Sequence, residues 1–278
     1  MTPGPVDLLP PLLRGHTAFV TGGGSGINLG IARAFARAGA NVAICGRSES
    51  RLQAAAAELT QLGARVSYSQ ADVRDPDLVE AALERTANEL APVSIVVAGA
   101  AGNFFSPAEN LSPKGFRTIV EIDLLGSFHT ANAAFEQLRE TRGSMLFISA
   151  GQAHLPFALQ AHVGAAKAGV ENLMRNLALE WGRFGIRANS LVPGPIEGTE
   201  GMKRLAGPVG EQVWTDAIPL GRFGSVDELA AMAVVLSSPL ASFVTGAQIV
   251  VDGGLGLSGL GSLSSAVANA AALDRGAV

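Results

Sequence analysis

Short apolar runs alternate along the chain with longer stretches in which apolar residues recur at helical spacing. Seven runs have the length and the Val, Ile and Phe content of buried strands: HTAFVTG, NVAICG, RVSYSQADV, SIVVAGAAG, SMLFISA, IRANSLVPG and QIVVDGG. Helical periodicity marks the intervening stretches 27–38, 50–62, 76–90, 118–139, 163–181 and 226–237. Since strands joined by helix-length segments form right-handed crossovers, the pattern predicts a doubly wound α/β fold, a seven-stranded parallel sheet with helices on both faces.

The chain shows no linker and no internal repeat, so we expect a single domain over residues 14–254. Residues 1–13 are interrupted by prolines and have no basic cluster, which predicts a short N-terminal arm rather than a secretory signal. Residues 255–278 are rich in Gly, Ser and Ala and are expected to form a C-terminal tail rather than a membrane span.

Composition favours a small-molecule partner in a reducing compartment. The chain has 48% hydrophobic and 16% charged residues, a formal net charge of -4 and no long basic run. It therefore lacks the charge pattern of proteins that bind nucleic acid or anionic membranes. Its one cysteine, Cys45, cannot form an internal disulfide and lies in an apolar run, as expected for a buried residue of a cytoplasmic protein.

A glycine-rich turn follows the first predicted strand and runs directly into an Ala-rich helix. It contains Gly22, Gly24, Ser25, Gly26 and Ile27. In such a turn the backbone can approach a pyrophosphate, and the N–H groups at the helix N-terminus favour its negative charge. An ordinary tight turn is the alternative, but a second apolar strand follows at the right place, which favours a dinucleotide site in a Rossmann-like fold.

Residues at the next strand ends predict which dinucleotide binds. The second strand ends with Arg47 in place of the acidic residue that would bond a ribose 2′-hydroxyl, so its guanidinium is expected to pair with the 2′-phosphate of NADP(H), the alternative being a solvated side chain. Asp72 is expected to accept from the adenine amino group, with Val73 against the ring. A cap of the following helix is a nearly equal alternative for Asp72. Small residues, among them Ala98 and Gly99, end the fourth strand and let a cofactor lie close.

Together, TGGGSGI, ADV, AGAAG, the helix containing Lys167 and LVPGPIEGT resemble the short-chain dehydrogenase/reductases over nearly the whole chain. That family uses a Tyr-x-x-x-Lys motif, a Ser that precedes it and an Asn on the preceding long helix. Here Lys167 is present, but Val163 stands at the Tyr position, Ala150 at the Ser position and Asp123 at the Asn position. In the glycine-rich turn, Asn28 stands where the family has its last glycine.

One branch of the family resembles this pattern, the peroxisomal type of 2,4-dienoyl-CoA reductase, which also replaces the Tyr and uses Asp and Lys. The likeness is carried by AAGNFFSPAENLS, EIDLLGSF, AHVGAAKAGV, LALEWG and NSLVPGPIEGTEGMKRL. It implies an NADPH-dependent oxidoreductase of fatty acid metabolism that acts on an acyl-CoA and assembles as a homotetramer. The peroxisomal address of that branch is absent, since the chain ends GAV.

The resemblance implies catalytic roles for Asp123 and Lys167. Hydride addition to the far carbon of a dienoyl thioester spreads negative charge to the thioester oxygen, so the site needs an enolate stabiliser and a proton source rather than an acid for an alkoxide. Lys167 is expected to bind the nicotinamide ribose and to place positive charge near the enolate, and Asp123 to relay a proton through water. Taken alone, each has an ordinary structural alternative, a lysine extending from an Ala-rich helix and an ion-pairing carboxylate.

The same resemblance implies binding residues after the sixth strand, which ends at Pro193 and Gly194. The backbone near Ile196 is expected to bond the nicotinamide carboxamide, and Thr199 to reach the diphosphate. Residues 198–214 are expected to form a mobile lid over the substrate.

A few further residues are candidates for substrate contacts or for replacing the tyrosine. Lys203 and Arg204 are candidates for the CoA phosphates and Phe104 for the acyl pocket, with solvated charges and core packing as alternatives. A different acyl-CoA or carbonyl reductase would use a substitute for the Tyr, and a catalytically silent NADP(H)-binding protein would need none. The candidate substitutes are His154, His162 and Ser149. No cluster of His, Cys and Asp has metal-ligand spacing, so no metal is expected.

Overall fold

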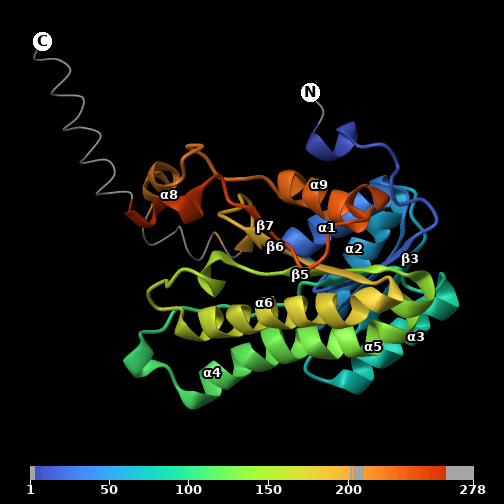
Figure 1. The fold of residues 1–278 in the computed structure, drawn as a ribbon, viewed down its shortest axis with the longest axis horizontal. Coiled ribbons are helices and arrows are strands. Elements are labelled where there is room, and N and C mark those ends of the chain that lie inside the picture. Colours follow the sequence, from blue (N-terminus) through green and yellow to red (C-terminus); the bar gives the residue numbers. More distant parts are fainter. Residues whose placement is uncertain (1–3, 201, 203–209, 261–278) are drawn as a thin grey trace, which may run out of the picture.

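A computed structural model describes residues 4–200, 202 and 210–260 (Figure 1). Seven strands form one sheet in the order β3-β2-β1-β4-β5-β6-β7, and all neighbouring strands are parallel. This confirms the predicted doubly wound α/β fold. The strands are β1 Thr17–Thr21, β2 Asn41–Gly46, β3 Val66–Gln70, β4 Ile95–Ala98, β5 Ser144–Ile148, β6 Arg187–Pro193 and β7 Gln248–Val251.

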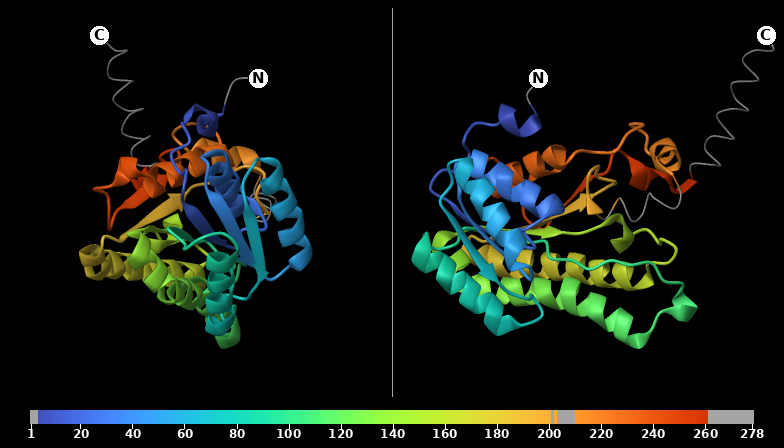
Figure 2. Two further views of the ribbon diagram at one scale, coloured as in Figure 1. Left: turned by 90° about the vertical axis from the view of Figure 1, so that its right-hand side faces the viewer. Right: turned by 180° about the vertical axis from the view of Figure 1, so that it is seen from behind.

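Helices cover both faces of the sheet (Figures 1 and 2). One apolar core joins the sheet to α1, α2 and α9, and a second core joins the opposite face to α3, α5 and α6. The helices are α1 Gly26–Arg37, α2 Glu49–Gln61, α3 Pro76–Glu89, α4 Pro113–Ile119, α5 Gly126–Thr141, α6 Ala161–Trp181, α8 Glu211–Ala217 and α9 Val226–Ser237. The thiol of Cys45 is fully buried in the second core, and burial raises its pKa to about 12.

The contact between α1 and α9 depends on the absence of one side chain. A Cβ atom at Gly30 would lie 1.9 Å from Cγ1 of Val226, so only glycine allows the two helices to pack this closely. The start of α9 is fixed by a reciprocal cap, because Ser225 Oγ accepts from the backbone N–H of Glu228 while the Glu228 carboxylate accepts from the backbone N–H of Ser225.

The stretch 118–139, predicted as one regular helix, differs from that prediction. The helical rod begins earlier, at Pro113, where Ser112 Oγ accepts from the N–H of Gly115. It passes through a π-helical segment, Val120–Leu125, before continuing as α5. Apolar periodicity alone cannot reveal such a segment, because one extra residue in a turn shifts the pattern only slightly.

Both ends of the described chain fold back onto the domain. A 3-10 turn at Pro5–Leu8 contacts α9 and buries Val6, and a second 3-10 turn at Leu255–Leu260 follows the last strand. The predicted boundaries of the arm, the domain and the tail stay predictions. Within the described residues, none of the helices combines the length and the apolar character needed to cross a bilayer.

Candidate active site

A cavity of about 1810 Å³ lies at the carboxyl ends of the strands. It spans the point between β1 and β4 where the strand order reverses, which is where doubly wound sheets bind ligands. Its lining includes most of the predicted binding residues: Gly22, Gly24, Ser25, Gly26, Ile27, Arg47, Asp72, Val73, Gly99, Phe104, Asp123, Lys167, Pro193, Gly194, Ile196 and Thr199. Ala98, the remaining candidate of the fourth strand, is buried in β4 and does not line the cavity.

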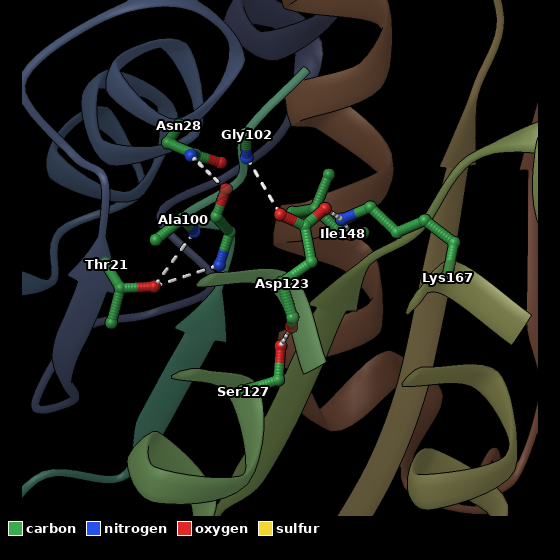
Figure 3. A network of polar contacts seen from close by, with 9 residues as sticks. Thr21, Asn28, Ala100, Gly102, Asp123, Ser127, Ile148 and Lys167 are labelled. Carbon is green, nitrogen blue, oxygen red and sulfur yellow. Dashed lines mark hydrogen bonds and ion pairs between the residues drawn. The ribbon is translucent and has the colours of Figure 1, made fainter. Parts of the chain in front are cut away.

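Asp123 and Lys167 meet in this cavity as a buried ion pair (Figure 3). Lys167 Nζ lies 3.1 Å from Asp123 Oδ2 and also donates to the carbonyl of Ile148 at 2.9 Å. The other carboxylate oxygen, Oδ1, accepts from the backbone N–H of Gly102 at 2.8 Å. Both side chains are almost fully shielded from solvent, so each charge depends on the other for compensation.

The π-helical segment brings Asp123 to the lysine. Asp123 lies in the middle of Val120–Leu125, and this segment packs against α6, which carries Lys167. Ser127 Oγ donates to the carbonyl of Asp123 at 2.6 Å and so secures the turn that follows. Such π segments occur preferentially at functional sites, because they redirect one side chain out of the regular helical pattern.

Val163 occupies the position of the family tyrosine without replacing its chemistry. It is buried in a small apolar cluster with Ile119 and Ala166 and lines the cavity beside Lys167. Its side chain has no proton to exchange, so the ion pair and not a phenol forms this wall of the cavity.

The other candidates for a replacement acid lie in different surroundings. Ser149 lines the cavity and is buried. The buried ring of His162 packs on Phe104 with 4.2 Å between centroids, and desolvation lowers the pKa of this histidine. His154 is exposed and contacts Gln248 on β7.

The predicted cofactor end of the cavity contains the glycine-rich turn and Asp72, for which a helix cap was the alternative role. Gly22 adopts a positive φ of 68°, which a side chain would strain, and the turn leads into α1. Asp72 does not cap the next helix. The cap of α3 is Asp75, whose carboxylate accepts from the backbone N–H groups of Asp77 and Leu78. Instead, hydrogen bonds from Arg74 hold the Asp72 carboxylate and lower its pKa.

Two features of the lining were missed by the sequence analysis. Arg51, in the first turn of α2, lines the cavity together with Arg47, which precedes that helix. The signal was available in the sequence, since a second arginine follows Arg47 closely after the same strand. A chain of side-chain amides runs from Gln152 Nε2 to Gln160 Oε1 at 3.0 Å and from Gln160 Nε2 to Asn103 Oδ1 at 2.8 Å. No spacing rule could have found that chain, because Asn103 follows β4 whereas Gln152 and Gln160 lie in the connection between β5 and α6.

The opposite end of the cavity has apolar walls. Phe157 and Trp214, the latter from α8, are stacked with ring centroids 6.1 Å apart, and both line the cavity.

The remaining predicted residues are only partly described. The hydroxyl of Thr199 donates to the carbonyl of Ile196 at 2.9 Å. The CoA candidates Lys203 and Arg204 lie outside the described residues, as does part of the predicted lid. Among the described residues, no group of three or more His, Cys, Asp or Glu side chains is arranged to hold a metal ion.

The fold and this cavity define a class, the dinucleotide-binding α/β proteins. The family of enoyl-(acyl carrier protein) reductases matches residues 22–256. The peroxisomal 2,4-dienoyl-CoA reductase SPS19 of Saccharomyces cerevisiae is 44% identical over 250 residues, which are 88% of this chain and 86% of that protein. The peroxisomal 2,4-dienoyl-CoA reductase of Pongo abelii is 43% identical over 252 residues, 90% of this chain and 86% of that protein.

A solved structure shares the fold. A short-chain oxidoreductase of Pseudomonas aeruginosa PAO1, determined with NADPH bound and described as containing an atypical catalytic center, superposes with a TM-score of 0.80 at 32% identity, covering 86% of this chain and 96% of that one. The chain therefore belongs to the short-chain dehydrogenase/reductase family. It is an oxidoreductase that resembles the 2,4-dienoyl-CoA reductases, as the sequence motifs indicated.

Proposed function

We propose that this protein is an NADPH-dependent 2,4-dienoyl-CoA reductase in which Asp123 and Lys167 form the catalytic pair. The buried ion pair carries this proposal, because it lies in the cavity beside Val163, where a carbonyl reductase of this family would have its tyrosine. The names of the two dienoyl-CoA reductases above support the substrate class.

The cofactor end of the cavity fits NADP(H). The glycine-rich turn has room for a pyrophosphate, since a Cβ atom at Gly26 would meet no atom within 4 Å, and it opens at the N-terminus of α1. Arg47 and Arg51 line the same end, and among the described residues neither forms an ion pair that would occupy its guanidinium. These two cations, one directly after β2 and one in the first turn of α2, favour a ribose 2′-phosphate over a 2′-hydroxyl.

The further binding residues would follow the family arrangement. Asp72 and Val73 would hold the adenine, while the backbone at Ile196 and the side chain of Thr199 would contact the nicotinamide and diphosphate ends. Phe104 lines the cavity beside this region and would contact the acyl group. Lys203 and Arg204 remain proposed contacts of the CoA phosphates.

A bound reduced nicotinamide would supply the hydride. The ammonium of Lys167 would stabilise the negative charge that reaches the thioester oxygen, and Asp123 would position a water that returns a proton to carbon. Hydride at C5 and a proton at C2 convert a 2,4-dienoyl thioester into a 3-enoyl thioester, which balances the reaction. Both relatives are named as (3E)-enoyl-CoA-producing, which supports this regiochemistry.

The first experiment measures NADPH oxidation by the purified protein with a 2,4-dienoyl-CoA, and identifies the product by mass spectrometry. NADH and a 3-oxoacyl-CoA serve as comparisons, and Lys167→Met tests the catalytic pair. We expect turnover only with NADPH and the dienoyl-CoA, lost in Lys167→Met. Reduction of the 3-oxoacyl-CoA would instead identify a carbonyl reductase, and NADPH binding without any turnover would identify a silent nucleotide-binding protein.

Cofactor preference has its own test. Arg47→Ala and Arg51→Ala should each raise the KM for NADPH about tenfold or more and leave the KM for NADH nearly unchanged, because a charge-assisted bond to the 2′-phosphate is lost only with NADPH. An equal effect on both cofactors would show that these arginines do not select the phosphate.

Assembly and location are also proposals. A homotetramer is supported by exposed apolar side chains on α5, α6 and β7, among them Phe128, Leu179 and Val250, which are 46%, 82% and 54% exposed. Light scattering would measure the mass, and a monomeric mass would refute this assembly. A cytoplasmic location would be tested by fluorescence microscopy of the tagged full chain.

A further inference from the structure

Asn28, which stands where the family turn has its last glycine, makes a contact that a glycine cannot make. It lies in the first turns of α1 and lines the cavity. Its Nδ2 donates to the backbone carbonyl of Gly99 at 2.8 Å (Figure 3). The side chain therefore joins the helix that follows the glycine-rich turn to the segment that follows β4.

The segment after β4 is shaped to receive this amide. A Cβ atom at Gly99 would lie 2.2 Å from Asn28 Oδ1, and one at Gly22 would lie 2.9 Å from Asn28 Nδ2, so any side chain at either glycine would displace it. Asn28 Oδ1 is buried and has no hydrogen-bond partner among the described residues. Because a buried amide oxygen without a partner is destabilising, the contact made by Nδ2 must hold the side chain in place.

A second residue holds the same segment from β1. Thr21 Oγ1 accepts from the N–H of Gly99 at 3.0 Å and from the N–H of Ala100 at 3.1 Å. The backbone at Gly99 is thus fixed through its N–H by Thr21 and through its carbonyl by Asn28 (Figure 3).

The held segment ends at the catalytic pair. Three residues after Gly99, the N–H of Gly102 donates to Asp123 Oδ1, and the other oxygen of this carboxylate pairs with Lys167. Lys167 is in turn held by the carbonyl of Ile148 at the end of β5. An unbroken series of hydrogen bonds and backbone therefore runs from the first turns of α1 to the lysine ammonium.

We propose that Asn28 is a positioning residue for the Asp123–Lys167 pair, acting through the backbone from Gly99 to Gly102. By fixing the Gly99 carbonyl, it orients the Gly102 N–H and thereby the carboxylate of Asp123. The effect on catalysis rests on the proposed function above, whereas the effect on the backbone does not. The proposed function and the proposed role of Asn28 in ordering the backbone can therefore fail separately.

The first test needs no substrate. Hydrogen exchange of the purified full chain is measured by mass spectrometry for Asn28→Gly and for a matched control, Asn132→Gly, which makes the same substitution at an exposed position inside α5. We expect exchange in peptides covering residues 99–102 to rise about tenfold in Asn28→Gly only, since a hydrogen bond that orders this segment is lost. Unchanged exchange, or an equal rise in the control, would overturn the proposal.

The second test separates positioning from cofactor binding. If the unsubstituted protein reduces a dienoyl-CoA, Asn28→Gly should lower kcat about tenfold while the KM for NADPH changes less than about threefold, because the lost bond orients the pair rather than binding the nucleotide. An unchanged kcat with a raised KM for NADPH would overturn the proposal and make Asn28 part of the nucleotide turn. If the unsubstituted protein is inactive, the proposed function fails and hydrogen exchange alone decides.

A second variant guards against a general loss of folding. Thr21→Val removes the acceptor for Gly99 and Ala100 and nearly keeps the shape of the buried side chain. It should give the same rise in exchange over residues 99–102 and the same split between kcat and KM. A normal exchange pattern in Thr21→Val together with a normal kcat would count against control of the pair through this segment.

Discussion

Replacing Lys167 by methionine should destabilise the fold as well as abolish activity. Methionine preserves the length and the apolar part of the side chain and removes only the ammonium. The Asp123 carboxylate would then be fully buried, and among the described residues the N–H of Gly102 would be its one remaining hydrogen-bond donor. Removing one partner of a buried ion pair typically costs about 3–5 kcal/mol, because it leaves an uncompensated charge in the interior.

The magnitude can be measured by urea unfolding at one fixed protein concentration, followed by tryptophan fluorescence. With an m-value of about 3 kcal/mol/M, the midpoint of Lys167→Met should fall by about 1 M or more. The double variant Lys167→Met with Asp123→Asn supplies the control, since it removes both charges while an asparagine oxygen can still accept from Gly102. We expect the double variant to recover more than half of the lost stability.

Two results would refute this reasoning. A single variant within about 1 kcal/mol of the unsubstituted protein would mean that solvent, rather than Lys167, compensates the carboxylate. A double variant no more stable than the single one would mean that the loss comes from altered packing of α6 and not from an unpaired charge.

Three further predictions concern other parts of the chain. A hydrogen bond from Arg222 lowers the pKa of Glu228 to about 2. Arg222→Met should therefore lower the stability slightly above the ordinary glutamate pKa, and this difference from the unsubstituted protein should disappear as the pH falls toward 2; unfolding measured across this range tests it. Gly30→Ala should lower stability by about 1–3 kcal/mol despite the better helix propensity of alanine, because its Cβ would overlap Val226, and calorimetry would detect the lowered Tm. Gln160→Leu should break the amide chain, whose outer members Asn103 and Gln152 line the cavity, and so raise the KM for the acyl-CoA with little change in the KM for NADPH. Equal effects on both KM values in steady-state kinetics would show that the chain does not position the acyl-CoA.

Much of the fold could be predicted from the spacing of apolar residues along the chain, because that spacing reflects which side of each helix or strand is buried. The stretch 226–237 matches α9 to the residue, since a serine cap and an apolar face mark it clearly. The π-helical segment could not be predicted, because one extra residue in a turn hardly changes the periodicity and its packing against α6 is a tertiary contact. The earlier start of that rod at Pro113 could have been found from the Ser-Pro pair.

For the site, the sequence alone indicated which residues meet but not how they are held. Lys167 and Asp123 were expected from the family spacing, and the structure brings them together. Asn28 was noticed only as a departure from the glycine pattern. Its partner is a backbone carbonyl 71 positions away, and no side-chain motif encodes such a contact.

The apolar cluster around Val163 has a consequence for chemoselectivity. Reducing an isolated ketone or aldehyde creates an alkoxide that must take up a proton at once, and Val163, which lines the cavity at the position of the family tyrosine, has none to give. A conjugated thioester avoids that demand by delocalising its charge. Under the proposed function, the valine therefore acts as a filter: carbonyl metabolites that enter the cavity would leave it unreduced, and NADPH would be spared for the conjugated substrate.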